Sequence, residues 1–158
     1  MSADALYQEI ILDHYRRPHH KGLRAPYDIE VHHTNPTCGD EITLRVRLRG
    51  SGDETVVEDV SYDGDGCSIS QASTSIMADL LVGATVAEGL EVEAEFHRLM
   101  LGLGQVAPDV DRLADAVALA GVARYPARVK CALLGWLAWK DAVVQVLGTR
   151  PATGEPTP

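Results

Sequence analysis

The clearest pattern in the chain is a strict alternation of apolar and polar side chains over residues 42–49. The alternating residues are Ile42, Thr43, Leu44, Arg45, Val46, Arg47, Leu48 and Arg49. A period of two places one set on the buried face of a strand and leaves the other, largely basic, set in solvent. Two more strand-like runs cover about residues 27–33 and 56–62, with short connections between the three. We therefore expect a three-stranded antiparallel sheet.

Helical spacing precedes and follows this sheet. Residues 6–15 predict an N-terminal helix that ends before Pro18, and a second helix follows residue 66 and ends near Gly83. Further helical segments are expected at 86–103, as one or two pieces, at 113–119 and at 126–147. The last segment starts at Pro126 and is apolar nearly all round, so we expect it to be buried. Strands followed by helices predict an α+β fold, in which the sheet packs with an N-terminal helix and a C-terminal helical layer.

The length of 158 residues suits one domain with a real hydrophobic core. We expect this domain to cover residues 1–147 and the tail at 148–158, rich in Pro, Thr and Gly, to be disordered. The sequence predicts no apolar run long enough for a bilayer and no signal peptide, so we expect a cytoplasmic protein without a membrane partner.

The charge of the chain is acidic and unevenly distributed. The net charge of −9 disfavours nucleic acid as a partner, because general binding to phosphates needs a basic face. Fourteen acids and two bases lie in residues 53–115, which is typical of a solvated surface. Five bases and one acid lie in residues 124–150, and this basic stretch contains Cys131.

Three cysteines, far apart in the sequence, do not indicate a disulfide framework. Each could be a small buried apolar residue. Their positions suggest more: Cys38 lies in a loop between two expected strands, Cys67 lies where a strand gives way to a helix, and Cys131 lies in the first turns of the last helix. A helix N-terminus favours the thiolate, and Cys67 has that setting fully and Cys131 partly.

Asp40 follows Cys38 by two residues and adds a fourth donor. Three thiolates and a carboxylate suit a tetrahedral zinc ion, and soft sulfur disfavours Mg²⁺ and Ca²⁺. Such a site would carry a formal charge of about −2, which Arg128 and Lys130 close to Cys131 would help to offset. Spacing alone leaves open whether Asp40 is a ligand or only a turn-forming residue, because the donors are scattered.

Three segments together resemble a known family. They are Asn-Pro-Thr-Cys-Gly-Asp at 35–40, Gly-Asp-Gly-Cys-Ser-Ile-Ser at 64–70 and Pro-Ala-Arg-Val-Lys-Cys-Ala at 126–132. They are similar to the signature segments of the SufU branch of the IscU/NifU N-terminal superfamily, and the resemblance extends over about residues 5–147. It implies the α+β fold described above and a zinc site of Cys38, Asp40, Cys67 and Cys131.

The resemblance also implies partners and an activity. A SufS-type pyridoxal-phosphate cysteine desulfurase would donate persulfide sulfur, and this sulfurtransferase would pass it on to downstream SUF scaffold proteins. Cys38 would be the sulfur acceptor, with a histidine of the partner taking its place on zinc. A glycine-containing loop can swing more easily than a helix start, which supports Cys38 over the other two cysteines. The expected helix at 6–15 and the basic residues Arg124 and Arg128 are candidate partner contacts.

Two alternatives stay open. Members of the IscU branch assemble a [2Fe–2S] cluster, and three thiolates with Asp40 could ligate one as well. That branch carries a histidine directly before its third cysteine, where this chain has Lys130, and the 64 positions from Cys67 to Cys131 resemble the longer SufU spacing. A domain with a purely structural zinc ion is the third reading.

We expect the histidines and tryptophans to be ordinary surface or packing residues. We expect the pairs His19–His20 and His32–His33 to be solvated, and His14 and His97 to be surface or packing residues. We expect Trp136 and Trp139 to pack in the core.

Overall fold

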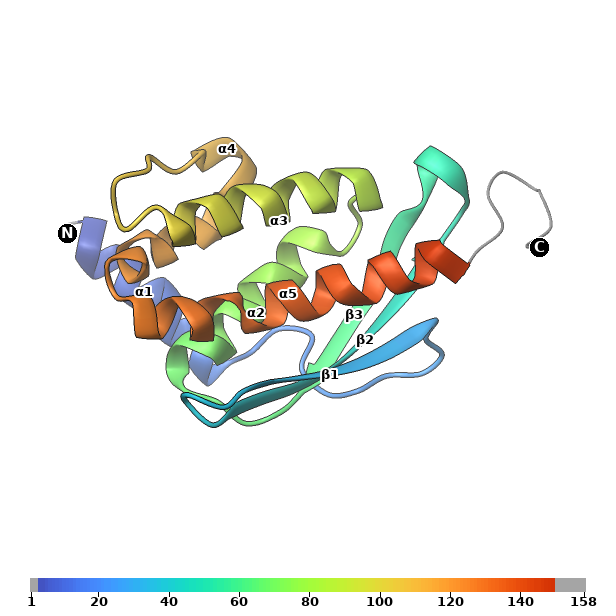
Figure 1. Ribbon diagram of the computed structural model, residues 1–158, viewed down its shortest axis with the longest axis horizontal. Coiled ribbons are helices and arrows are strands. Elements are labelled where there is room, and N and C mark those ends of the chain that lie inside the picture. Colours follow the sequence, from blue (N-terminus) through green and yellow to red (C-terminus); the bar gives the residue numbers. More distant parts are fainter. Residues whose placement is uncertain (1–2, 150–158) are drawn as a thin grey trace.

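The computed structural model describes residues 3–149, in which a three-stranded antiparallel sheet packs against helices (Figure 1). The strands follow the order of the chain across the sheet: β1 (Ile29–Asn35), β2 (Asp40–Arg49) and β3 (Val56–Asp63). Each is shifted or lengthened by one or two residues relative to the predicted run. The predicted fold class is confirmed.

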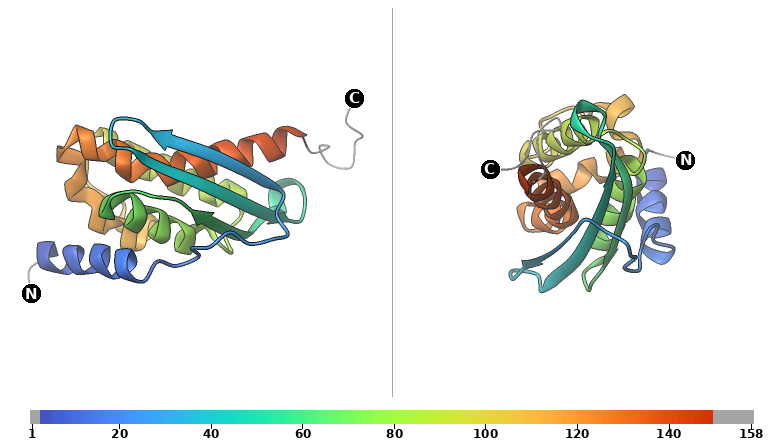
Figure 2. Two further views of the ribbon diagram at one scale, coloured as in Figure 1. Left: turned by 90° about the horizontal axis from the view of Figure 1, so that it is seen from below. Right: turned by 90° about the vertical axis from the view of Figure 1, so that its right-hand side faces the viewer.

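The central strand β2 shows the expected alternation of burial. Its apolar side chains, at the even-numbered positions, are buried, and Leu44 and Val46 are fully covered. Leu44 pairs with Val31 of β1 on one side and with Tyr62 of β3 on the other, so the apolar side chains of three strands form one continuous face. On the opposite face Arg45 lies over the ring of Tyr27, 4.2 Å from its centroid. Helices cover only the apolar face of the sheet (Figure 2).

The helical layer is organised around α5 (Pro126–Thr149), which packs on β1, β2, α2 (Ser68–Leu81) and α3 (Val86–Leu101). Trp136 and Trp139 of α5 are fully buried, and the ring of Trp136 stacks on Phe96 of α3 at 4.2 Å. Ser73 of α2 joins α2 to α5, because its Oγ donates to the Ala132 carbonyl (2.6 Å) and accepts from Trp136 Nε1 (2.9 Å). The predicted core role of both tryptophans is confirmed.

The N-terminal helix α1 (Ala3–Arg16) packs against α2 and against a 3₁₀ segment, η2 (Ala114–Arg124). A short helix, α4 (Val110–Leu113), precedes η2, and a single 3₁₀ turn, η1 (Gly52–Glu54), lies between β2 and β3. The helical segment expected at 113–119 is present: Leu113 ends α4, and residues 114–119 belong to the 3₁₀ helix η2. Ala114 has φ of 45°, which stops α4, and the buried small side chains that follow pack in the tighter 3₁₀ form.

The remaining helix boundaries are close to those predicted. α3 is one uninterrupted helix, because Gly102 ends it at the first of the two glycines that the sequence offered as breaks. α5 continues to Thr149, so the first two residues of the expected tail at 148–158 are helical. The rest of that expected tail lies outside the described residues.

The length and composition of α5 would allow it to cross a membrane, contrary to the expectation from the sequence. Its most apolar window has a mean hydropathy of 1.2, yet 61% of this window is buried inside the protein. Its residues cover the sheet and contact three other helical segments. The apolar character of α5 is thus accounted for by its place in the core.

Candidate metal centre

Three separate segments carry the four predicted ligands to one end of the domain, where the β1–β2 turn meets the starts of α2 and α5 (Figure 1). Cys38 lies in that turn, followed by Gly39 with φ of 71°, a conformation that favours glycine. Asp40 is the first residue of β2, and Cys67 is the N-cap residue of α2. Cys131 lies in the second turn of α5. None of the cysteines lies within a strand, as the sequence indicated.

Three of the four predicted ligands form a tight group. One ligand atom each from Cys38, Asp40 and Cys131 lie within 4.8 Å of one another. The Sγ atoms of Cys38 and Cys131 are 3.1 Å apart, and both lie 3.8 Å from the carbonyl oxygen of Ala127. A strand-to-strand turn and a helix that begins near residue 126 thus bring two thiols into contact.

Cys67 stands beside this group and joins it through Asp40. Its Sγ lies 4.0 Å from Asp40 Oδ2, and its backbone N–H donates to Asp40 Oδ1 at 3.1 Å. A Cβ added at Gly66 would lie 2.2 Å from Ser70 Oγ and 3.1 Å from Asp40 Oδ1. Glycine before Cys67 therefore allows the α2 start to approach the carboxylate closely.

Burial differs among the donors. Asp40 and Cys131 are each 3% exposed, whereas Cys38 and Cys67 are exposed. Burial, followed by hydrogen bonds to Cys38 and Asp40, raises the pKa of the Cys131 thiol far above its ordinary value. Without a bound cation the Cys131 thiol is therefore held in its protonated form, although the sequence places it near a helix start.

Sequence reasoning missed three polar neighbours of the thiols. The Asn35 side-chain amide donates toward Cys131 Sγ at 3.8 Å, Ser70 Oγ lies 3.9 Å from Cys67 Sγ, and the Ala127 carbonyl faces two thiols. Two of them had a signal in the sequence, because Asn35 opens the Asn-Pro-Thr-Cys-Gly-Asp segment and Ser70 occupies the third position after the helix N-cap. The carbonyl contact depends on tertiary packing and had none.

Arg128 and Lys130 are exposed residues of α5. Within residues 3–149, no hydrogen bond or ion pair joins either side chain to the four ligand candidates. Their predicted role is therefore long-range compensation of charge, which stays a prediction. Arg128 instead lines a cavity of about 520 Å³ together with Asp4 and Tyr7 of α1 and with Tyr125.

The histidine pairs of the chain are less solvated than the sequence suggested. His14 is buried, at 4% exposure, and His19 and His20 both contact Asp79 of α2. His33 contacts Asp141 of α5 at 2.8 Å. The expectation of solvated rings holds for His19 and His32, whose side chains are 44% and 53% exposed, but not for His20 and His33, at 26% and 27%. The sequence does not reveal which carboxylates the folded chain places next to these rings.

The donor set suits a soft or borderline divalent ion. Three thiols surround a buried carboxylate. A bound cation would lower the pKa of the Cys131 thiol and would offset the free-energy cost of burying the Asp40 carboxylate. The fold and the site together thus define an α+β domain with a thiol- and carboxylate-lined centre that could hold a metal ion. Comparison with known proteins narrows this class: residues 6–132 match the NifU-like N terminal domain, and the chain belongs to that family.

Two relatives cover nearly the whole chain. The zinc-dependent sulfurtransferase SufU of Bacillus subtilis is 40% identical over 145 residues, which are 92% of this chain and 94% of that protein. The iron–sulfur cluster assembly scaffold protein IscU of Streptococcus pyogenes serotype M1 is 41% identical over 138 residues, with coverages of 87% and 82%. The family resemblance inferred from the sequence is confirmed.

Solved structures agree with this assignment. The N-terminal part of a NifU-like protein from Brucella abortus superimposes with a TM-score of 0.82 at 26% identity, covering 93% of this chain and 98% of that one. An iron–sulfur cluster assembly scaffold protein for the SUF system from Fervidobacterium islandicum AW-1 gives a TM-score of 0.69 at 33% identity, with coverages of 90% and 99%.

Proposed function

We propose that this chain is a zinc-dependent sulfurtransferase that accepts persulfide sulfur from a SufS-type cysteine desulfurase and passes it on to SUF scaffold proteins in the cytoplasm. The observation that carries the proposal is the group of Cys38, Asp40 and Cys131, in which an exposed thiol contacts a buried one beside a buried carboxylate. The 40% identity to a zinc-dependent sulfurtransferase supports it.

Cys38, Asp40, Cys67 and Cys131 are the proposed zinc ligands. Bound zinc would lower the pKa of the thiols and neutralise part of the negative charge of the donor set. Asp40 is held for this role by the Cys67 N–H, which donates to Oδ1 at 3.1 Å and leaves Oδ2 facing the thiols. Asn35 fixes the β1 side of the site through its contact with Cys131.

Cys38 is the proposed sulfur acceptor. It is exposed on a turn, whereas Cys131 is 3% exposed within a long helix and Cys67 is tied to Asp40 by its backbone. The Cys38 thiolate attacks the outer sulfur of the donor persulfide. A new S–S bond forms at Cys38 Sγ, the S–S bond of the donor breaks, and the electron pair leaves on the donor thiolate. The reaction needs no external oxidant or reductant.

The desulfurase contact is proposed at the cavity of about 520 Å³ between α1, η2 and α5. It is lined by residues of both predicted contact regions: Asp4, Tyr7, Gln8, Ile11, Arg124 and Arg128. Arg128 precedes Cys131 by three positions on α5, so a partner seated there would lie close to the thiols.

A scaffold function is the second candidate. The 41% identity to an iron–sulfur cluster assembly scaffold and the exposure of two of the three thiols favour it. The two functions differ in what the purified protein holds. A sulfurtransferase retains one zinc ion at the thiols and is colourless, whereas a scaffold reconstituted without oxygen acquires the visible absorption of a [2Fe–2S] cluster.

The test is transfer of labelled sulfur. A SufS-type desulfurase is supplied with ³⁵S-cysteine, and label on this chain is measured on gels run without reductant. We expect label on the wild type and on Thr37→Ala, a control in the same turn, and more than tenfold less on Cys38→Ser. Full labelling of Cys38→Ser, or loss of label only in Cys131→Ser, would refute the assignment of Cys38.

A further inference from the structure

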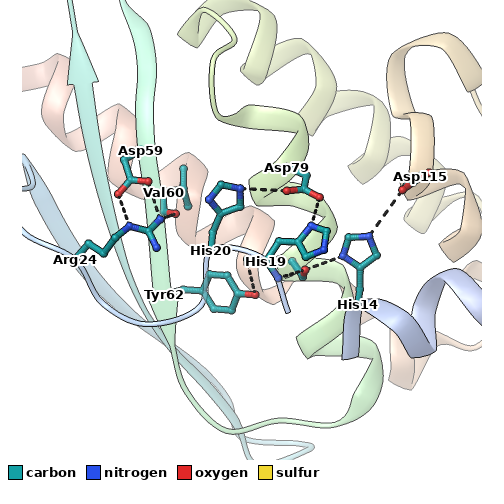
Figure 3. A network of polar contacts seen from close by, with 10 residues as sticks. His14, His19, His20, Arg24, Asp59, Val60, Tyr62, Asp79 and Asp115 are labelled. Atoms are coloured by element: carbon teal, nitrogen blue, oxygen red, sulfur yellow. Dashed lines mark hydrogen bonds and ion pairs between the residues drawn. The ribbon is translucent and has the colours of Figure 1, made fainter. Parts of the chain in front are cut away.

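A second group of potential metal ligands lies away from the cysteines, where the end of α1 meets the last turn of α2 (Figure 3). One ring nitrogen each of His14 and His19 and one oxygen of Asp79 lie within 4.8 Å of one another. The two imidazole centroids are 4.6 Å apart. The comparisons and the proposed sulfur transfer assign no role to this group.

His14 is oriented as a metal-binding histidine usually is. Its ring is buried, and Nδ1 lies 2.7 Å from Ser75 Oγ, while Nε2 lies on the side of Asp115, 3.8 Å from Oδ2. A histidine that ligates a metal through one nitrogen commonly uses the other to donate to an oxygen of the protein, which fixes the tautomer and the ring. Ser75 offers that oxygen.

The position of His19 is determined by its backbone. Its N–H donates to Ser75 Oγ at 2.8 Å, and its carbonyl accepts from the Tyr62 hydroxyl at 2.9 Å. The same Ser75 oxygen therefore holds His14 and His19 in register. The ring of His19 then meets Asp79 Oδ2 at 2.5 Å through Nδ1.

Asp79 is held from its second oxygen. His20 Nε2 contacts Asp79 Oδ1 at 3.1 Å, so both oxygens face imidazole nitrogens. His20 has φ of 63°, a backbone conformation that is uncommon outside glycine, and this turn directs its ring to the carboxylate. Two imidazoles from the connection after α1 thus face the Asp79 carboxylate of α2, and the ring of His14 lies beside that of His19 (Figure 3).

A cavity beside His14 and Asp79 gives an ion access to these two donors. It has a volume of about 250 Å³ and is lined by His14, Asp79 and Asp115 together with the apolar side chains of Ile76, Leu80 and Ala114. Asp115 is well exposed, at 63%, and therefore marks the solvent side of this cavity. Among residues 3–149 no lysine or arginine pairs with Asp79 or Asp115, so the two carboxylates lack a fixed counter-charge.

We propose that His14, His19 and Asp79, with Asp115 on the solvent side, bind a second divalent transition-metal ion such as Zn²⁺. Two imidazoles with carboxylates are donors that suit zinc and its neighbours, whereas Mg²⁺ and Ca²⁺ prefer oxygen alone. The ion would displace the protons that now bridge His19 to Asp79. It would also fasten the end of α1 to the last turn of α2. The N-cap residue of α2, Cys67, lies at the other end of that helix.

The test counts metal ions in tag-free protein. Wild type is dialysed against micromolar Zn²⁺ and analysed by plasma mass spectrometry, alongside His19→Asn, Asp79→Asn and His32→Asn. We expect two zinc ions per wild-type chain, one in His19→Asn and in Asp79→Asn, and two in His32→Asn. His32 is the matched control, because it is an exposed histidine on β1 whose Nε2 lies 4.0 Å from Glu41.

Ser75→Ala keeps every donor but removes the oxygen that orients His14 and His19. We expect this substitution to lower the affinity for the second zinc ion about 10- to 100-fold, as changes next to metal ligands commonly do. The side chains of His19 and Asp79 are 44% and 38% exposed, so both variants should fold, and circular dichroism checks this.

Cobalt separates the two sites. Co²⁺ bound by thiolates gives a strong near-ultraviolet charge-transfer band, and Co²⁺ bound by imidazole and carboxylate does not. The band is expected to be equal in wild type and Asp79→Asn. A wild type that takes up only one ion, or a second ion that persists in both His19→Asn and Asp79→Asn, would overturn this inference without touching the cysteine centre.

Discussion

The Sγ atoms of Cys38 and Cys131 lie 3.1 Å apart, although 93 positions separate the two residues in the sequence. One thiol is on an exposed turn and the other is buried in α5. Because the two thiols differ in access to solvent but share one centre, the first can meet a partner while the second holds its place.

Removal of zinc should destabilise the protein. The proposed ligands tie together the β1–β2 turn, α2 and α5, and an ion that binds only the folded chain adds about 4 kcal/mol to the free energy of unfolding at a free concentration of a thousand Kd. Tm should therefore fall when a strong chelator removes the zinc ion from the cysteine centre. One equivalent of zinc should restore Tm in the wild type and much less in Cys131→Ser. An equal response of both proteins would contradict the ligand set.

Gly135→Ala should weaken the cysteine centre from a distance. A Cβ at Gly135 of α5 would lie 2.4 Å from Oγ1 of Thr74, a buried residue of α2 that donates to the Ser70 carbonyl at 2.9 Å. The two helices must separate, which we expect to cost about 1–3 kcal/mol in the free energy of unfolding. Since α2 and α5 carry Cys67 and Cys131, zinc affinity should fall as well.

Gly121→Ala is the matched control for that substitution. A Cβ at Gly121 of η2 meets no atom within 4 Å. We expect its free energy of unfolding and its zinc affinity to stay within experimental scatter of the wild type. Urea denaturation and competition with a zinc indicator measure both quantities. A Gly135→Ala protein as stable as Gly121→Ala would show that α2 and α5 adapt more easily than their packing implies.

Reversal of charge at Arg128 should weaken binding of the desulfurase. Arg128 is exposed beside the cavity between α1 and α5, whereas the side chain of Arg124 lies against Gly104. We expect Arg128→Glu to raise the Kd for the SufS-type enzyme about tenfold or more at low salt, with less effect at high salt. Arg49→Glu, at the opposite end of β2, should leave the Kd unchanged in the same calorimetric titration.

The acid side of the stability profile should depend in part on Asp141. Hydrogen bonds that its carboxylate accepts from Gln145 and from His33 lower the pKa of Asp141 from its ordinary value. A lowered pKa in the folded state stabilises the fold above the unfolded pKa, and this contribution disappears as pH falls through the folded pKa, below about 4. Because the carboxylate is 41% exposed, the effect should stay below about 1 kcal/mol.

Titration of Asp141 by NMR checks this directly. Gln145→Ala and His33→Gln should each raise its pKa. In acid denaturation, Asp141→Asn should lose the part of the pH dependence below about 4 that Asp141 contributes in the wild type. Asp111→Asn, which removes one exposed negative charge from α4, should not. If the pKa of Asp141 is unchanged in both variants, the two hydrogen bonds are not the cause of its shift.

Local patterns predicted most of the secondary structure. Alternation over 42–49 placed β2 because side chains on a strand face opposite sides whatever the rest of the chain does. Pro126 placed the start of α5, since proline is favoured in the first turn of a helix. The segment 113–119 was recognised as helical, but small apolar residues fit both α- and 3₁₀-helices, and only packing chose between the two forms.

The candidate site also has features that the sequence predicted and features that only the folded structure shows. The cysteine-bearing segments could be recognised from the sequence, because each combines a donor with glycine or a helix start in a short stretch. No short segment of sequence could show that Cys131 is buried, that Asn35 contacts its sulfur, or that His14 and His19 lie close to Asp79. These relationships join residues from different elements, and burial and distance between them arise only when the elements pack. The sequence by itself therefore determined which donors are available, and the tertiary structure decided which of them meet, because metal binding depends on proximity in space.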